Sequence, residues 1–92
     1  MSTYSALDID VLAPDTEFRH TRLRTGYAID EVDQFVEVVE KALRSVSPRL
    51  RAEEVAGRQF SQVMFKPGYR MEDVDKYLGE AERWLYQRER EG

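Results

Sequence analysis

Few residues in this sequence could do chemistry on a substrate. His20 is the only histidine, and the chain has no cysteine. His20 lies among arginines, without the spacing that gathers metal ligands or orients a nucleophile. The acidic pairs Asp30 with Glu31 and Glu72 with Asp73 open predicted helices, where carboxylates most often balance the helix dipole. No glycine-rich phosphate loop occurs. The sequence therefore predicts no catalytic residue, no metal site and no cofactor.

Two short segments instead mix cationic with apolar side chains. Such mixtures suit insertion at an anionic membrane interface. The alternative is that the apolar residues pack against helices while the cations stay in water. Nucleic acid is a poor match, because the formal net charge is −4 and base-reading modules are usually basic. The membrane-binding candidates in these segments are Arg19, Arg22, Leu23 and Arg24 in the first, and Met64, Phe65 and Lys66 in the second.

These two segments belong to an internal repeat. Residues 18–40 align with residues 60–82 without a gap, and similar pairs such as Leu23 with Phe65 fill the spaces between identical ones. We expect a single domain over residues 1–92, made of two repeats at about 7–46 and 50–90. The identical pairs are Phe18 with Phe60, Gly26 with Gly68, Tyr27 with Tyr69, Val32 with Val74, Asp33 with Asp75, and Glu40 with Glu82.

Each repeat passes through a loop that ends in Gly-Tyr and then enters a helix. We expect Gly26 and Gly68 to supply a positive φ or a close backbone approach. The acidic first turns place the helix starts near residues 28 and 70. Pro48 ends the first helix. A short helix is expected at about residues 51–57, with a less regular counterpart at residues 7–12.

After each Gly-Tyr, apolar residues step alternately by three and four residues, which is the a and d pattern of a coiled coil. A second apolar line, with Phe35 and Ala42 or Tyr77 and Trp84, runs beside each seam, so each helix should pack against more than one neighbour. The predicted fold class is all-α, with two loop-plus-coiled-coil-helix repeats packed as a helical bundle or a pseudo-dimeric coiled coil. Pairing within one chain and pairing between two chains both remain open. The helix-seam residues are Ile29, Val32, Val36, Val39, Leu43, Met71, Val74, Leu78, Ala81 and Leu85, of which Val36 and Leu78 are expected to be buried.

The chain's length and its first residues bear on assembly and location. At 92 residues a single core is small, so self-association as a homodimer or higher is expected to add stability. Residues 1–14 have neither a basic start nor a sustained apolar run, unlike a signal peptide. No later run approaches the roughly 18 apolar residues of a membrane span. The sequence therefore favours a cytoplasmic protein.

Both repeats share one order of residues: a phenylalanine, a basic loop, Gly-Tyr, an acidic turn, a valine, an acid and an aromatic residue. The first reads Phe18…Arg24-Thr25-Gly26-Tyr27…Asp30-Glu31-Val32-Asp33-Gln34-Phe35. The second reads Phe60…Lys66-Pro67-Gly68-Tyr69…Glu72-Asp73-Val74-Asp75-Lys76-Tyr77-Leu78. This order resembles the N-terminal domain of DivIVA-like proteins of bacterial cell division and polar growth. The likeness covers about half of the chain directly.

The resemblance implies a non-enzymatic scaffold or adaptor that recruits other cell-division or wall-synthesis proteins, attached peripherally at the inner face of the cell membrane. It also implies a parallel coiled-coil dimer whose loops expose an apolar and a basic residue, and by position it adds Phe18 and Phe60 to the membrane-binding candidates. The family usually has one copy before a long coiled coil, and often an aspartate where this chain has Ala28 and Arg70. A soluble interaction module without membrane binding and an unrecognised enzyme remain the alternatives.

Overall fold

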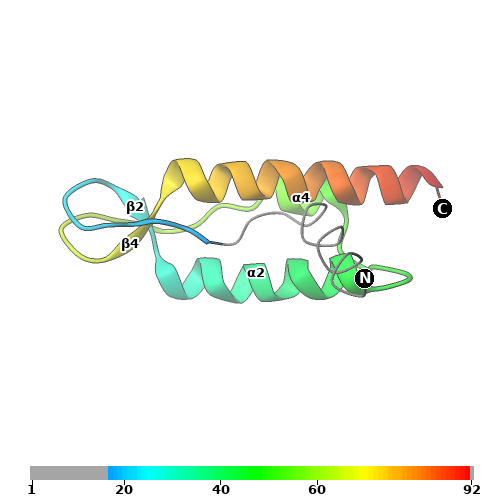
Figure 1. Cartoon of the computed structure of the whole chain (residues 1–92), viewed down its shortest axis with the longest axis horizontal. Helices are drawn as coiled ribbons and strands as arrows, with labels where there is room; N and C mark the ends of the chain where they lie inside the picture. The colour runs from blue at the N-terminus through cyan, green and yellow to red at the C-terminus, as the bar shows by residue number, and fades with distance from the viewer. Residues whose placement is uncertain (1–16, 92) are drawn as a thin grey trace, which may run out of the picture.

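Two long helices leave one end of the molecule together and run in the same direction (Figure 1). The computed structural model describes residues 17–91, so the predicted segment at 7–12 lies outside the described residues. The predicted helix starts near 28 and 70 are confirmed, since the long helices begin at Ile29 and Met71. The elements are β1 (His20–Thr21), β2 (Gly26–Tyr27), α2 (Ile29–Arg44), α3 (Ala52–Ala56), β3 (Gln62–Val63), β4 (Gly68–Arg70) and α4 (Met71–Glu91).

The predicted all-α fold class is wrong. The protein has a small mixed α/β fold, because its loops form a four-stranded antiparallel sheet in the order β1-β4-β2-β3. Each strand has only two or three residues, too few for the alternation that marks a strand in a sequence. The strands form because backbone N–H and C=O groups in the loops need partners, and they find them in the other repeat.

The sheet interleaves the two repeats. At its centre Tyr27 of β2 lies opposite Tyr69 of β4. Outside them, His20 of β1 lies opposite Tyr69, and Gln62 of β3 lies opposite Tyr27. Each repeat therefore inserts its second strand beside both strands of the other repeat. The repeats pair within one chain, and residues that match in the repeat exchange places about an approximate two-fold axis.

Gly26 and Gly68 are needed for close backbone approach and not for a positive φ. No glycine among residues 17–91 has a positive φ, so that half of the expectation is wrong. A Cβ on Gly26 would lie 2.6 Å from the carbonyl oxygen of Tyr69 and 2.8 Å from Cγ2 of Thr21. A Cβ on Gly68 would lie 2.7 Å from Cγ2 of Val63. The two second strands can cross at this separation only because neither glycine has a side chain.

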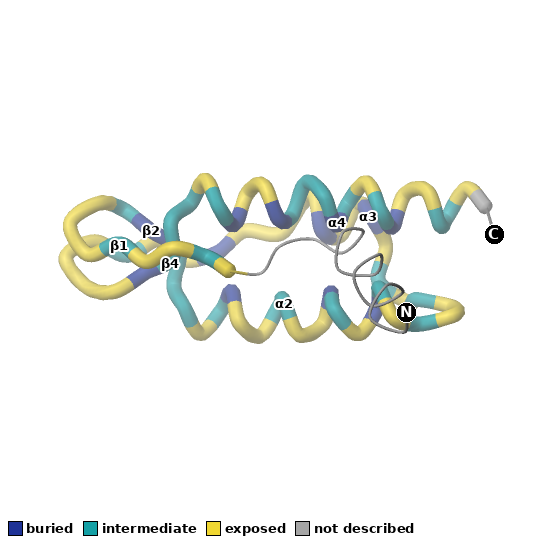
Figure 2. The backbone as a smooth tube through the Cα atoms, viewed as in Figure 1, coloured by how far each residue is buried: buried dark blue, intermediate teal, exposed yellow. Residues whose placement is uncertain are grey.

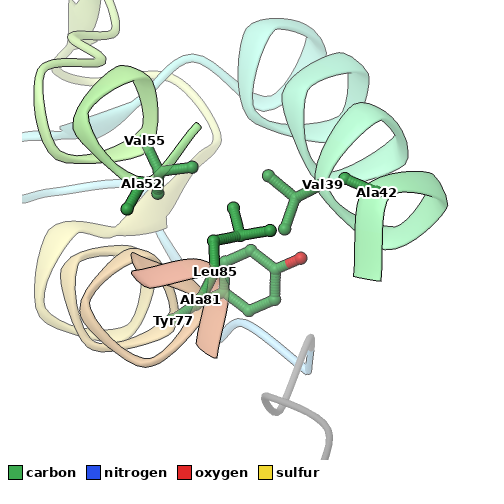
Figure 3. Packing of buried hydrophobic residues seen from close by; sticks show 7 residues of the cluster. All are labelled: Val39, Ala42, Ala52, Val55, Tyr77, Ala81 and Leu85. Atoms are coloured by element: carbon green, nitrogen blue, oxygen red, sulfur yellow. The ribbon is translucent and has the colours of Figure 1, made fainter. Parts of the chain in front are cut away.

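Three helices enclose the main core. Figure 3 shows side chains of α2, α3 and α4 that point toward one another. A second cluster lies nearer the sheet, where Phe60 packs with Val32 and Val74. The short helix α3 packs on α4, as the wide apolar face of the long helices predicted. The main cluster comprises Val39, Ala42, Ala52, Val55, Tyr77, Ala81 and Leu85.

The coiled-coil seam is only partly the line that is buried. Val36 and Leu78 are partly buried and not buried as expected, whereas Tyr77 and Ala42, which lie beside the seam, are buried. The line shifts because α3 and Phe60 fill the space between the helices, which a two-stranded coiled coil would close. Of the remaining seam residues, Val32, Val39, Val74, Ala81 and Leu85 are buried, and Ile29, Leu43 and Met71 are partly buried.

Arg88 lies three residues after Leu85, where the spacing of the second seam would place an apolar residue. Its guanidinium donates to the backbone carbonyls of Leu43, Ser45 and Val46. These carbonyls belong to the end of α2 and to the residues after it, where helix geometry supplies no partner. The arginine therefore caps α2 from α4 and joins the ends of the two long helices.

Candidate functional site

The loop that connects β1 to β2 and the loop that connects β3 to β4 meet at one end of the molecule. We call residues 22–24 and 64–66 the tip surface; they lie between β1 and β2 and between β3 and β4 (Figures 1 and 2). Leu23 is 79% exposed, Phe65 76% and Met64 51%. Leu23 and Phe65 are matching positions of the repeat, and the interleaved sheet brings them to the same end. The tip surface thus combines exposed apolar side chains with the cations Arg22, Arg24 and Lys66.

Three membrane-binding candidates from the sequence lie elsewhere. Phe60 is buried, with its ring 5.4 Å from that of Tyr27. Phe18 is partly buried, with ring centroids 5.2 Å from Tyr69 and 5.5 Å from Tyr77. Both phenylalanines pack against the core, so neither can reach a membrane while the fold is intact. The tip surface therefore excludes Phe18 and Phe60.

Arg19 is the third membrane-binding candidate outside the tip surface. It is paired with Asp73 at the start of α4. Its Nη2 and Nε donate to the two carboxylate oxygens at 2.8 and 3.0 Å, and its backbone N–H donates to the same carboxylate at 2.9 Å. These bonds from Arg19 hold the pKa of Asp73 well below its usual range. Glu31 accepts the backbone N–H of Ser61 at the matching place, which lowers its pKa. Arg19 therefore holds the first loop against the start of α4.

We expect Asp73→Asn to destabilise the protein and to weaken its acid sensitivity. Because the folded-state pKa is lowered, Asp73 stabilises the fold above its unfolded value of about 4. That stabilisation is lost as pH falls from there through the folded-state pKa. Melting temperatures between pH 7 and 2.5 should show a smaller acid decline than in wild type.

Asp30→Asn is the matched control, because Asp30 is exposed in the first turn of α2 and shares only the helix-dipole interaction. Equal effects of the two substitutions at every pH would show that the Arg19–Asp73 pair does not hold the loop.

Two reciprocal tyrosine–aspartate bonds complete the support of the tip surface. The hydroxyl of Tyr27 donates to Asp75 at 2.8 Å, and that of Tyr69 donates to Asp33 at 2.6 Å. Burial, followed by the carboxylate, raises the pKa of each tyrosine to about 12. Each Gly-Tyr loop is thereby fixed to the helix of the other repeat. Sequence reasoning missed these bonds, although both residues of each pair are identical between the repeats.

The remaining cations of the tip surface are less constrained. Arg24 Nη2 lies 3.3 Å from Glu72, and because both side chains are more than half exposed this pair contributes little. Among the described residues, no ion pair engages Arg22 or Lys66. Arg22 and Lys66 are therefore available to an anionic partner, in a protein whose formal net charge is −4.

No arrangement for catalysis stands out in residues 17–91. A hollow of about 260 Å³ has Asp73, Lys76 and Glu80 among its lining residues, but Asp73 is already bound by Arg19. Within the described part of the chain, no three His, Cys, Asp or Glu residues gather to hold a metal ion. None of the described helices is long and apolar enough to cross a bilayer. The sequence-based expectation that the chain is not an enzyme stays a prediction.

Comparison of the chain with protein-family models, curated proteins and solved structures gives no match.

Proposed function

We propose that this protein is a non-enzymatic, DivIVA-like adaptor of bacterial cell division or polar growth that attaches to anionic membrane through its tip surface. The observation that carries the proposal is the exposure of Leu23 and Phe65 at the same end of the fold, beside Arg22 and Lys66. The residue order shared with DivIVA-like proteins supports the same reading. We place the protein in the cytoplasm, at the inner face of the cell membrane.

The chemistry of the tip surface fits weak, reversible attachment. Full burial of a leucine or phenylalanine side chain contributes about 1.5–3 kcal/mol. A cation near an anionic surface adds about 1 kcal/mol. The sheet and the Tyr–Asp bonds fix the two loops side by side, so the second loop binds with little further loss of entropy. Attachment by both loops together should therefore be measurable where that of one loop is marginal.

An adaptor needs further surface for its partners. The helices lead away from the tip surface, and the linker between α2 and α3 lies at the opposite end (Figure 1). Val46 in that linker is 95% exposed and Val38 on α2 is 49% exposed. We propose these regions as contacts for other cell-division or wall-synthesis proteins, or for a second copy of the chain. Measuring the solution mass over a range of concentrations tests self-association, and a constant monomer mass would oppose it.

The membrane proposal predicts sedimentation with anionic vesicles. Full-length protein should bind vesicles containing phosphatidylglycerol at low salt and bind less at physiological salt, because the cationic contribution is screened. The double variant Leu23→Ser with Phe65→Ser should lose most binding at both salt levels, because the apolar contribution is removed.

Val46→Ser is the matched control, since it removes an exposed apolar side chain at the opposite end. Wild-type protein that stays in the supernatant at low salt would contradict membrane attachment. The exposed apolar residues would then favour the second candidate, a protein-interaction module that uses the tip surface to bind another protein.

A further inference from the structure

We infer that the two loops of the tip surface are unequal: the second loop supplies most of the apolar contact with lipid, and Phe65 is kept there at a cost to folding stability. This inference rests on the proposed membrane function and states what each loop contributes to it. The first loop chiefly links the repeats, and its contribution to lipid binding is mainly electrostatic.

The backbone at Phe65 has an unusual conformation. Its φ is 63°, and it is the only non-glycine residue among residues 17–91 with a positive φ. A residue with a Cβ is strained in this left-handed region, where glycine or asparagine is usual. The Phe65 ring is also 76% exposed, and it stacks on no other ring in the described part of the chain. Folding therefore gives no reason for an aromatic residue at this position.

Pro67 restricts the backbone close to Phe65. A proline disfavours helical backbone angles in the residue before it, which narrows the conformations open to Lys66. The chain bends over residues 64–66, and the positive φ within this bend falls at Phe65. In the first loop Thr25 stands in the place of Pro67, and Leu23 has no positive φ. The two loops thus match in sequence position but differ in backbone conformation, and proline makes the second loop the stiffer one.

The neighbours of the two apolar residues also differ. Phe65 follows Met64, which is 51% exposed, so the second loop presents two adjacent apolar side chains. Leu23 stands alone between Arg22 and Arg24, and Arg24 reaches back to Glu72 on α4. The same loop is held at its base by the three bonds from Arg19 to Asp73. More apolar surface, on a stiffer backbone, is therefore available in the second loop.

The test compares Phe65→Asn with Leu23→Asn in the full-length chain, using vesicles that contain phosphatidylglycerol and thermal unfolding. Asparagine tolerates the left-handed region, so Phe65→Asn should raise the melting temperature by a few degrees. The same variant should lower vesicle partitioning about tenfold, from the loss of a buried phenylalanine. Leu23→Asn should leave the melting temperature unchanged or lower it, and should weaken partitioning about threefold or less.

The two measurements distinguish failure of this inference from failure of the proposed membrane function. Equal losses of partitioning in the two variants, or a lower melting temperature for Phe65→Asn, would overturn the inference while leaving membrane attachment intact. Wild-type protein that does not bind vesicles would overturn the proposed function, and with it the assignment of Phe65 to lipid contact.

Discussion

Replacing Val39 with aspartate is expected to unfold most of the protein at room temperature. Val39 is fully buried on α2 and packs in the cluster with Tyr77 and Leu85 of α4 (Figure 3). An aspartate there must either keep an unpaired charge in an apolar site or become protonated, and either outcome costs several kcal/mol. Domains of this kind have a total stability of about 5–15 kcal/mol, with small ones near the lower limit. This one substitution can therefore remove most of the free energy of unfolding.

The neighbouring residue provides a control with the same chemical change. Val38 is 49% exposed on α2, so Val38→Asp should change the free energy of unfolding by less than about 1 kcal/mol. Circular dichroism with urea titration measures both variants. A Val39→Asp variant with the midpoint of wild type would show that α2 does not pack against α4 as described.

Gly26→Ala is expected to have the second largest effect, although it adds a single methyl group. The new Cβ would lie 2.6 Å from the carbonyl oxygen of Tyr69, which is a backbone atom held in the β2–β4 pair. Relief requires the two central strands to move apart, which would also strain the bonds from Tyr27 to Asp75 and from Tyr69 to Asp33. Overpacking of this kind costs about 1–3 kcal/mol.

Gly79→Ala should have the opposite sign. Gly79 lies within α4, and a Cβ added there meets nothing within 4 Å. Alanine in a helix interior is favoured over glycine by about 1 kcal/mol, so the variant should unfold at a higher temperature than wild type. Thermal unfolding of Gly26→Ala, Gly79→Ala and wild type therefore gives an ordered series. If Gly26→Ala were as stable as Gly79→Ala, the interleaved sheet would be contradicted.

Interleaving also explains how one chain can present two loops at a fixed spacing. The loops are joined through β2 and β4 and are tied by reciprocal Tyr–Asp bonds to the helices of the opposite repeat. Two copies of one unit are then free to diverge where they are exposed, and they do so at Leu23 and Phe65. The fully buried pair Val32 and Val74 keeps the same residue in both repeats. Both repeats therefore share one core, while their exposed loops carry different residues.

Features that depend on residues close together in the chain could be predicted from the sequence. The acidic first turns located the starts of α2 and α4, and the spacing of apolar residues identified Val32, Val39, Val74 and Leu85 as core. Comparison of one half with the other found the repeat. Each of these signals is local or periodic, because helices satisfy their hydrogen bonds and form their apolar faces within a few residues.

The way in which the repeats combine depends on contacts that exist only in the folded chain. The sheet joins residues far apart in the chain, such as Tyr27 with Tyr69. It does so through backbone groups, which nearly all residue types share, so no pattern of side chains predicts the pairing. The same pairing gives Gly26 its role in close approach, takes Arg19 to Asp73 and leaves Phe65 exposed in a strained conformation. Contacts between distant segments are fixed by the whole fold, and so the residues available to a partner became visible only once the chain was folded.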